Sequence, residues 1–257
     1  MAVASKHVFG GLVLAQAVVA AGRSVASDRS INSLHAYFLR AGDPSIAQTI
    51  VVERIRDGRS FSHRKVEVRQ GDRCIAEMLC SFAVPGPGVS HQAAMPAVPP
   101  ADDLLDDAVT LGDLDDPRLS VTRMGPFEFR AAETHSRIAR ERGEKTDRSR
   151  MWLRAKGSAP DDALVQTALL VYASDMTVLD PTTRPHALAL SAGDLWPTSL
   201  DHAVWFHQPV AVDSWFLLDL DSPWAGDGRG LARGRVFTAD GVLAAEIAQE
   251  GLLRAGS

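Results

Sequence analysis

Residues 66–82, VEVRQGDRCIAEMLCSF, and residues 235–251, RVFTADGVLAAEIAQEG, follow the same pattern from end to end. Each stretch predicts a strand, a tight turn and a second strand that pairs with the first. A second pair of stretches also matches, because SLHAYF (33–38) corresponds to SLDHAVWF (199–206) with a small insertion. The two halves of the chain therefore repeat one structural unit.

A strongly apolar helix is expected in each half. Residues 9–22, FGGLVLAQAVVAAG, are apolar on nearly every side, and Gly22 is expected to end that helix as its C-cap. Residues 163–176, ALVQTALLVYASDM, have the same character, and the preceding SAPDD (158–162) predicts Ser158 as the N-cap. Helices with this composition are expected to be buried.

The remaining periodic segments predict strands, because they are rich in β-branched and aromatic residues and are bounded by turn residues. They span residues 33–43, 46–58, 61–84, 125–133, 148–157, 199–210, 214–222, 228–241 and 242–254. The 61–84 segment is expected to be a hairpin that turns at residues 69–72. The mixed-charge residues 134–147 are expected to form a solvated loop.

An α+β fold follows from this order of elements. A single helix wrapped by a curved antiparallel sheet is the hotdog architecture, and two copies in one chain form a double hotdog. We expect an N-terminal unit at residues 1–84, a linker at 85–120 and a C-terminal unit at 121–257. The first unit lacks a strand ahead of its helix. That strand is missing, is supplied by another chain, or precedes the start of this sequence.

The linker is expected on composition. Five of the 14 prolines lie between residues 85 and 100, and the Asp-rich run ADDLLDDAVTLGDLDD (101–116) follows them. Neither stretch suits the interior of a sheet. The Asp run is expected to be solvated rather than to bind an ion.

Charge and cysteine content exclude several classes of function. A net charge of −5 and a pI near 5.9 argue against nucleic acid as a partner. No apolar run approaches the roughly 18–20 residues that span a bilayer, so no membrane association is expected. Cys74 and Cys80 lie roughly 20 Å apart if they share one strand, too far for a disulfide. The two cysteines and the eight histidines show no metal-ligand spacing, and a cytoplasmic protein without metal or cofactor is expected.

The last strand contains an anomaly. Gln249, Glu250 and Gly251 interrupt its apolar pattern, either because the strand frays at a sheet edge or because it carries a site. In the duplication, Gln249 aligns with Cys80, so the fold itself does not require an amide there. Only the second half carries a polar set at this position, as expected for a duplicated enzyme with one working site.

Several blocks, in the right order and over nearly the whole chain, resemble the bacterial acyl-CoA thioesterase II (TesB-like) family. They are HVFGG (7–11), HAYFLRAGD (35–43), RDGRSFSHRKV (56–66), GSAPDDALVQTALLVYASD (157–175), LDHAVWFHQP (200–209) and DGVLAAEIAQEG (240–251). In that family an Asp, a Thr or Ser and a Gln position a water on the thioester. The resemblance assigns these roles to Asp175 in YASD, Ser199 in TSLDH and Gln249 in AQEG.

The implied chemistry is self-consistent. A thiol has a pKa of about 8.5, so the thiolate leaves without a strong general acid and a site without His is sufficient. A carboxylate that accepts the water's proton contributes ~10²–10⁴-fold. Backbone N–H groups at the start of a hotdog helix are candidates for binding the oxyanion. Acyl-CoA is the expected substrate, and a homo-oligomer is expected.

Alternatives remain open at this point. A non-catalytic acyl-CoA-binding hotdog protein would keep the fold without turnover, and a hotdog hydratase would act on enoyl-CoA, although its usual Asp/His pairing on one helix is absent. No G-x-S-x-G motif indicates a serine nucleophile. His202 and His207, near Trp205, serve either packing or chemistry. The basic residues 56–65 form either a solvated hairpin, which is preferred, or a site for CoA phosphates.

Overall fold

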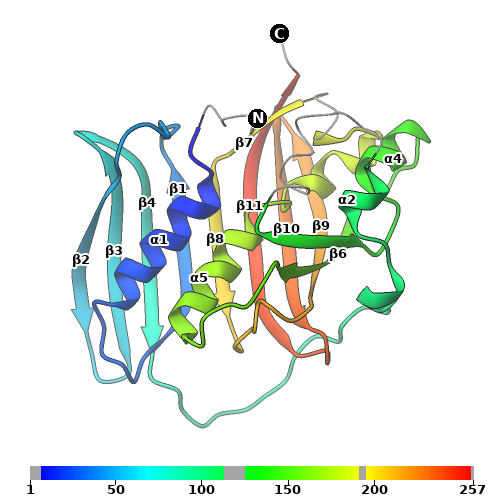
Figure 1. Cartoon of the computed structure of the whole chain (residues 1–257). Coiled ribbons are helices and arrows are strands. Elements are labelled where there is room, and N and C mark those ends of the chain that lie inside the picture. The colour runs from blue at the N-terminus through cyan, green and yellow to red at the C-terminus, as the bar shows by residue number, and fades with distance from the viewer. Residues whose placement is uncertain (1–6, 113–124, 191–194, 256–257) are drawn as a thin grey trace.

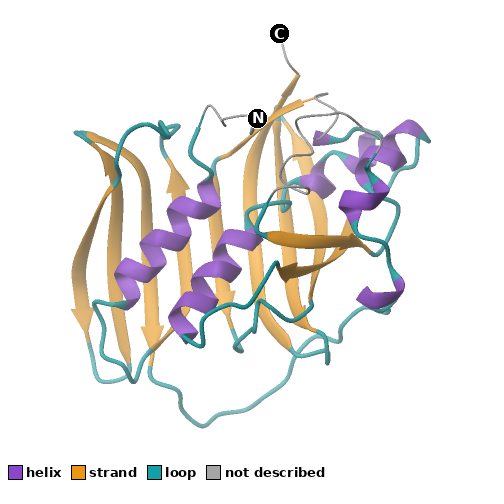
Figure 2. Cartoon of the chain, in the orientation of Figure 1, coloured by secondary structure: helices purple, strands orange, loops and turns teal. Residues whose placement is uncertain are grey.

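The architecture is one antiparallel sheet with two helices on one of its faces (Figures 1 and 2). It is seen in a computed structural model that describes residues 7–112, 125–190 and 195–255. Within these residues the sheet has eleven strands.

The elements follow in chain order as α1 Gly10–Gly22, β1 Ser30–Phe38, β2 Thr49–Asp57, β3 Phe61–Gln70, β4 Arg73–Ala83, η1 Ala101–Asp103, α2 Asp107–Thr110, β5 Phe127–Ala131, α4 Ser136–Glu141, β6 Arg148–Ala155, α5 Ala163–Ser174, η3 Asp180–Thr182, η4 Arg184–His186, β7 Leu195–Ser199, β8 Asp201–Phe206, β9 Phe216–Gly226, β10 Arg229–Thr238 and β11 Leu243–Ala255. The expected strands are all present, and the 61–84 hairpin turns at Gly71, whose φ is +59°.

The strand order is β2-β3-β4-β1-β8-β11-β10-β9-β6-β5, and β7 pairs with the far end of β11. The strands of the first repeat form one side of the sheet and those of the second repeat form the other. They join where β1 pairs antiparallel with β8, with Ser33 opposite Trp205 and Tyr37 opposite Asp201. The duplication read from the sequence thus becomes two halves of one continuous sheet.

Helices α1 and α5 lie side by side across this sheet and run in opposite directions (Figure 1). The end of α1 meets the start of α5, since a Cβ on Gly22 would come within 2.4 Å of the Leu164 side chain. The helix ends at Gly22 as expected, but the prediction of Gly22 as its C-cap is wrong, because Arg23 is the cap and has the right-handed conformation. Gly22 instead allows the two helices to approach closely.

Two other local predictions are wrong. The N-cap of α5 is Asp162 rather than Ser158: its carboxylate accepts from the backbone N–H groups of Leu164 and Val165. Residues 134–147 are not a plain solvated loop, because α4 forms within them and its Ala139 is buried. Residues 7–9, directly ahead of α1, form no strand, and residues 1–6 lie outside the described residues.

The chain between the repeats packs on the second half of the sheet. Residues 85–100 contain no helix or strand, yet the Trp152 indole donates to the Pro99 carbonyl at 2.9 Å. The expected solvation of the Asp run is wrong at Asp107, whose buried carboxylate accepts from the Ala131 N–H at 3.0 Å. Residues 113–116 of that run lie outside the described residues.

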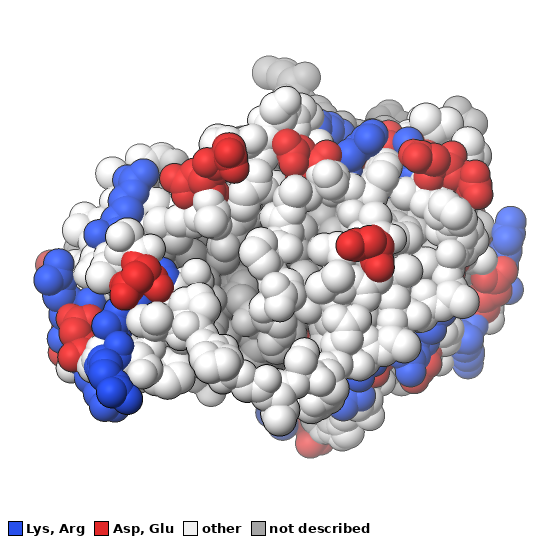
Figure 3. All heavy atoms as spheres, turned by 90° about the horizontal axis from the view of Figure 1, so that it is seen from below, with Lys and Arg blue, Asp and Glu red and all other residues white. Residues whose placement is uncertain are grey.

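The surface is not uniformly polar. Seen from below, most charged side chains gather toward the rim, and the middle of the face is hollowed and largely uncharged apart from acidic atoms to the right of its centre (Figure 3). At this end, where α1 ends and α5 begins, Gly22, Ile31, Phe82 and Leu164 line a cavity of about 330 Å³.

The expectation that the helices are buried holds on only one side of the pair. An apolar groove of about 310 Å³ lies along the outer side of α1 and α5, and Leu12 in it is 39% exposed. Among the described helices, none is long and apolar enough to cross a membrane.

Candidate functional site

Asp175 follows the last residue of α5 and is buried against the first turn of α1. The Gly11 N–H hydrogen-bonds its carboxylate, and a Cβ on Gly10 would come within 2.8 Å of Asp175 Oδ2. Burial raises the pKa of Asp175 to about 7, although the hydrogen bonds from Gln249 and Gly11 act in the opposite direction. The carboxylate is therefore poised to exchange a proton near neutral pH.

Gln249 lies in the middle of the sheet, not at its edge. Its strand β11 is flanked by β10 on one side and by β8 and β7 on the other, and Gln249 is only 1% exposed. The frayed-edge interpretation of this stretch is therefore wrong. Gly251 serves close packing, because a Cβ there would come within 2.4 Å of the Leu179 side chain.

Ser199 ends β7 and lies opposite Gly251 of β11. The Gln249 amide nitrogen donates to Ser199 Oγ at 2.7 Å and also hydrogen-bonds the Asp175 carboxylate. Three residues that are 24 and 50 positions apart in the chain thus meet through one amide group. The structure brings together all three side chains that the sequence singled out.

This arrangement leaves hydrogen-bonding capacity for a small molecule. Asp175 Oδ1 is buried and has no hydrogen-bond partner among the described residues. Ser199 Oγ accepts from Gln249, which leaves its hydroxyl proton available to donate. A water molecule can donate to Asp175 and accept from Ser199 at the same time.

Two further polar residues, His202 and Ser174, adjoin the set formed by Asp175, Ser199 and Gln249, which is called the hydrolytic set below. His202 of β8 is fully buried, with Nδ1 against Gln249 Oε1 and Nε2 at 2.8 Å from Ser174 Oγ. Burial lowers the pKa of His202 to about 4, so the ring is neutral at pH 7. Sequence reasoning noted His202 without a role and did not consider Ser174. Their proximity to the assigned residues, in YASD and TSLDH, was the available signal.

The corresponding position in the first unit is apolar. Leu34 of β1 lies opposite Cys80 of β4, whereas Ala203 of β8 lies opposite Ala248 of β11. One residue further along this register, His202 lies beside Gln249. Since Cys80 aligns with Gln249, the counterpart of His202 is Leu34.

Other candidates lie elsewhere. His207 Nε2 is 3.4 Å from Glu246 Oε2, and both line a hollow of about 390 Å³ on the sheet face opposite the helices. No group of three or more His, Cys, Asp or Glu in the described residues is arranged to hold a metal ion. The Gly11 N–H, at the start of α1, bonds Asp175. This N–H is therefore already used by Asp175, and binding of the oxyanion by other N–H groups at a helix start stays a prediction.

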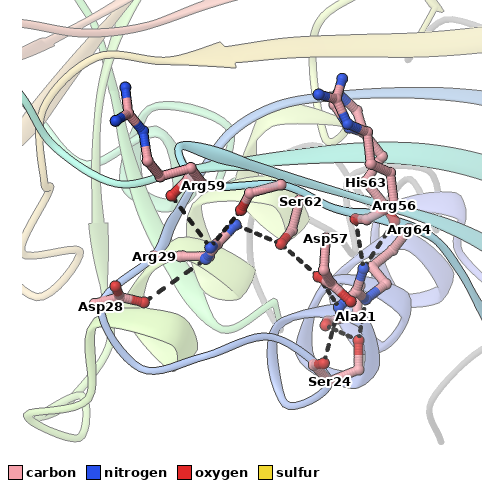
Figure 4. A network of polar contacts seen from close by, with 11 residues as sticks. Ala21, Ser24, Asp28, Arg29, Arg56, Asp57, Arg59, Ser62, His63 and Arg64 are labelled. Atoms are coloured by element: carbon pink, nitrogen blue, oxygen red, sulfur yellow. Dashed lines mark hydrogen bonds and ion pairs between the residues drawn. The ribbon is translucent and has the colours of Figure 1, made fainter.

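The basic segment 56–65 forms the hairpin of β2 and β3, and Arg64 in it is buried rather than solvated (Figure 4). Its guanidinium donates to Asp57 Oδ1 at 2.7 Å and to Ser24 Oγ at 2.8 Å. Arg29 similarly donates to Ser62 Oγ at 2.7 Å. These two arginines therefore tie the hairpin to the segment after α1.

Comparison with known proteins gives consistent matches. The sequence profile of the family described as "Acyl-CoA thioesterase" matches residues 123–252, and that described as "Acyl-CoA thioesterase N-terminal domain" matches residues 1–83. Acyl-coenzyme A thioesterase 8 of Homo sapiens is 39% identical over 267 residues, which cover 98% of this chain and 82% of the relative. Acyl-CoA thioesterase 2 of Haemophilus influenzae is 35% identical over 257 residues, which cover 97% and 88%.

Solved structures agree. The crystal structure of acyl-CoA thioesterase II TesB2 from Mycobacterium marinum superposes with a TM-score of 0.82 at 36% identity, covering 97% of this chain and 90% of that chain. A protein with a hot dog fold from Alicyclobacillus acidocaldarius superposes with a TM-score of 0.80 at 19% identity, covering 100% and 90%. The predicted double hotdog is confirmed.

Proposed function

Because this chain belongs to the acyl-CoA thioesterase family, a family of thioester hydrolases, we propose that it hydrolyses acyl-CoA to the free acid and CoA. A water molecule held by Asp175, Ser199 and Gln249 attacks the thioester carbonyl directly. The observation that carries this proposal is the buried Asp175 carboxylate, which has one unpartnered oxygen and shares the Gln249 amide with Ser199.

The steps follow from the properties of each group. Asp175, with a pKa of about 7, accepts a proton from water as the oxygen attacks the carbonyl carbon. Ser199 and Gln249 fix the direction of attack. The tetrahedral intermediate then expels the CoA thiolate, whose conjugate acid has a pKa of about 8.5, so no acidic side chain needs to protonate it.

The burial of Asp175 and Gln249 suits this chemistry. In a site with little bulk water, a carboxylate interacts more strongly with the developing charges, and a held water needs little reorganisation. The raised pKa has a cost, because about half of Asp175 is protonated at pH 7. It also makes the carboxylate a stronger base.

Thiol release measured with an Ellman-type reagent tests the function directly. Wild-type protein is expected to release one thiol per free acid formed, with both products quantified over a panel of acyl-chain lengths. Tight binding of acyl-CoA without thiol release would support a non-catalytic binding protein instead. Addition of water to enoyl-CoA with the thioester intact would support a hydratase.

A homo-oligomer in the cytoplasm is part of this proposal. The apolar groove along α1 and α5 supports the oligomer, because Leu12, Val19, Val165 and Leu169 line it and Leu12 is exposed. Light scattering coupled to size-exclusion chromatography measures the oligomer. Leu169→Glu is expected to lower the measured mass if a second copy covers the groove.

A further inference from the structure

We propose that His202 is a positioning residue for the hydrolytic site, holding the Gln249 amide in the one orientation that serves both Ser199 and Asp175, and that Ser174 fixes the required tautomer of His202. This inference rests on the proposed function, because it assigns a role relative to the hydrolytic set. It extends that set beyond the three residues that the sequence identifies.

The first step is the orientation of Gln249. A primary amide has an acceptor end and a donor end that differ little in shape, so packing alone does not choose between them. Serving both Ser199 and Asp175 requires the nitrogen to face them, as it does. The opposite orientation would place the amide oxygen against the carboxylate. Activity therefore depends on a group that distinguishes the two ends.

His202 can make this distinction. Gln249 Oε1 can only accept, so His202 Nδ1, which lies against it, must carry the proton and donate. A flipped amide would place N–H groups against this N–H. The neutral ring implied by a pKa of about 4 is compatible with one proton on Nδ1.

Ser174 completes the chain. With the proton on Nδ1, His202 Nε2 must accept, and the Ser174 hydroxyl at 2.8 Å is its donor. The same hydroxyl also donates to the Val171 carbonyl at 2.9 Å, so in this tautomer its one proton is shared between that carbonyl and the ring. Hydrogen bonds then run in one direction, from Ser174 to His202, to Gln249, and on to Ser199 and Asp175.

The first unit shows that the fold does not need this histidine. Its counterpart Leu34 is fully buried beside Cys80, so leucine fits the same ladder position within the same architecture. A buried His, Gln and Ser in the second unit therefore require a reason other than packing. Orientation of the amide supplies one.

The test is a double-mutant cycle on thiol release, using His202→Leu, Gln249→Cys and both together, with thermal unfolding and acyl-CoA affinity measured for each. His202→Leu is expected to lower kcat ~10²-fold while KM changes less than about twofold, because it removes a control on transition-state geometry. In the Gln249→Cys background, the same change is expected to cost less than about twofold, because the amide to be oriented is gone.

Two variants separate positioning from packing. His202→Asn keeps an N–H near the Nδ1 position and is expected to stay within about tenfold of wild-type kcat, despite leaving a larger void than Leu. Ser174→Ala is expected to lower kcat by roughly three- to tenfold, because it removes the preference for one tautomer but not the ring.

Three outcomes would overturn the inference while leaving the hydrolytic set intact. They are wild-type kcat in His202→Leu, equal losses from His202→Leu in both backgrounds, and a loss in His202→Asn as large as in His202→Leu. Full activity in Gln249→Cys would instead remove Gln249 from the hydrolytic set, and the inference would fall with the proposed mechanism.

Discussion

The two halves of the sheet use the same ladder position in opposite ways. In the first half Leu34 and Cys80 pack as neutral groups, and burial raises the pKa of the Cys80 thiol to about 12. In the second half His202 and Gln249 occupy the matching places, both fully or almost fully buried and both hydrogen-bonded. A buried polar group without partners costs roughly 1–3 kcal/mol. The second half avoids this cost because His202 and Gln249 hydrogen-bond to each other and to their neighbours, and these residues belong to the proposed hydrolytic site.

The largest expected effect on kcat is at Asp175, because no other residue of the hydrolytic set can accept the water's proton. Asp175→Asn is expected to lower kcat by about 10³-fold or more, because an amide cannot accept the proton of the attacking water. Acyl-CoA affinity should remain close to that of the wild type, since the proposed role of Asp175 is to bind the water and not the acyl-CoA. Steady-state thiol release and equilibrium binding measure the two quantities. A loss of binding equal to the loss of rate would place Asp175 in substrate binding.

Thermal unfolding provides the control for this variant. The folded-state pKa of Asp175 is raised to about 7, so the wild type loses stability as pH increases from about 4 to about 7, because the carboxyl group ionises in the unfolded chain while it stays protonated in the folded one. Asp175→Asn carries no such charge. It is expected to be more stable than the wild type at pH 8, by up to a few kcal/mol, and to differ little at pH 4.

The next largest effect on kcat is expected at Gln249, whose counterpart in the first half of the sheet is Cys80. Gln249→Cys copies the first half into the second and is expected to lower kcat by ~10²–10³-fold, because both amide hydrogen bonds are lost. Gln249→Glu serves as a size-matched control and is expected to be as damaging, since it places a second carboxyl group beside Asp175. Wild-type activity in Gln249→Cys would show that the polar half has no catalytic advantage over the apolar one.

A smaller effect is expected from pH. Since Asp175 is proposed to act as a carboxylate and its pKa is about 7, kcat should rise with pH through 7 and level off above 8. The value at pH 6 should be roughly tenfold below the plateau. A profile of kcat for a fast-hydrolysed acyl-CoA measures this limb. A flat profile between pH 5 and 8 would contradict a raised pKa at the proton acceptor.

The smallest effect on activity is expected in the first half. Cys80→Gln should leave kcat unchanged but lower the free energy of unfolding by about 1–3 kcal/mol, because Leu34 offers the new amide no partner. Cys80→Met, of similar size without the polar group, separates crowding from the unpaired amide. Urea titration measures both variants. Equal stability for the two would mean that the first half tolerates a buried amide.

Much of the fold follows from local sequence signals. The repeat at 66–82 and 235–251 predicted the two hairpins, and the turn of the first was correctly predicted at residues 69–72, which contain Gly71. Each of these features depends on only a few neighbouring residues. The misplaced cap of α5 shows the limit of this reasoning: Ser158 and Asp162 both suit an N-cap, and the choice depends on where the chain leaves β6.

The three candidate site residues could be identified from the sequence, but the residues that contact and orient them could not. Resemblance to a family singled out Asp175, Ser199 and Gln249. Pairing of β7 with β11 brings Ser199 and Gln249 together, and Asp175 reaches them from the end of α5. The residue of the first half that corresponds to His202 could not be identified from the sequence. A gapped alignment of SLHAYF with SLDHAVWF matches the two histidines, whereas the sheet register shows that Leu34 is the counterpart of His202. Burial of Arg64 and Asp107 was also hidden, because it depends on tertiary contacts.

The central claim is that Asp175 activates a water and does not itself attack the thioester. A single turnover in H₂¹⁸O, with enzyme in excess over acyl-CoA, tests it by mass spectrometry of both product and protein. Direct attack predicts one ¹⁸O atom in the free acid and an unlabelled, unacylated peptide containing Asp175. An acyl group or an ¹⁸O atom on Asp175 would contradict the account, because it would show that an anhydride with the enzyme precedes hydrolysis.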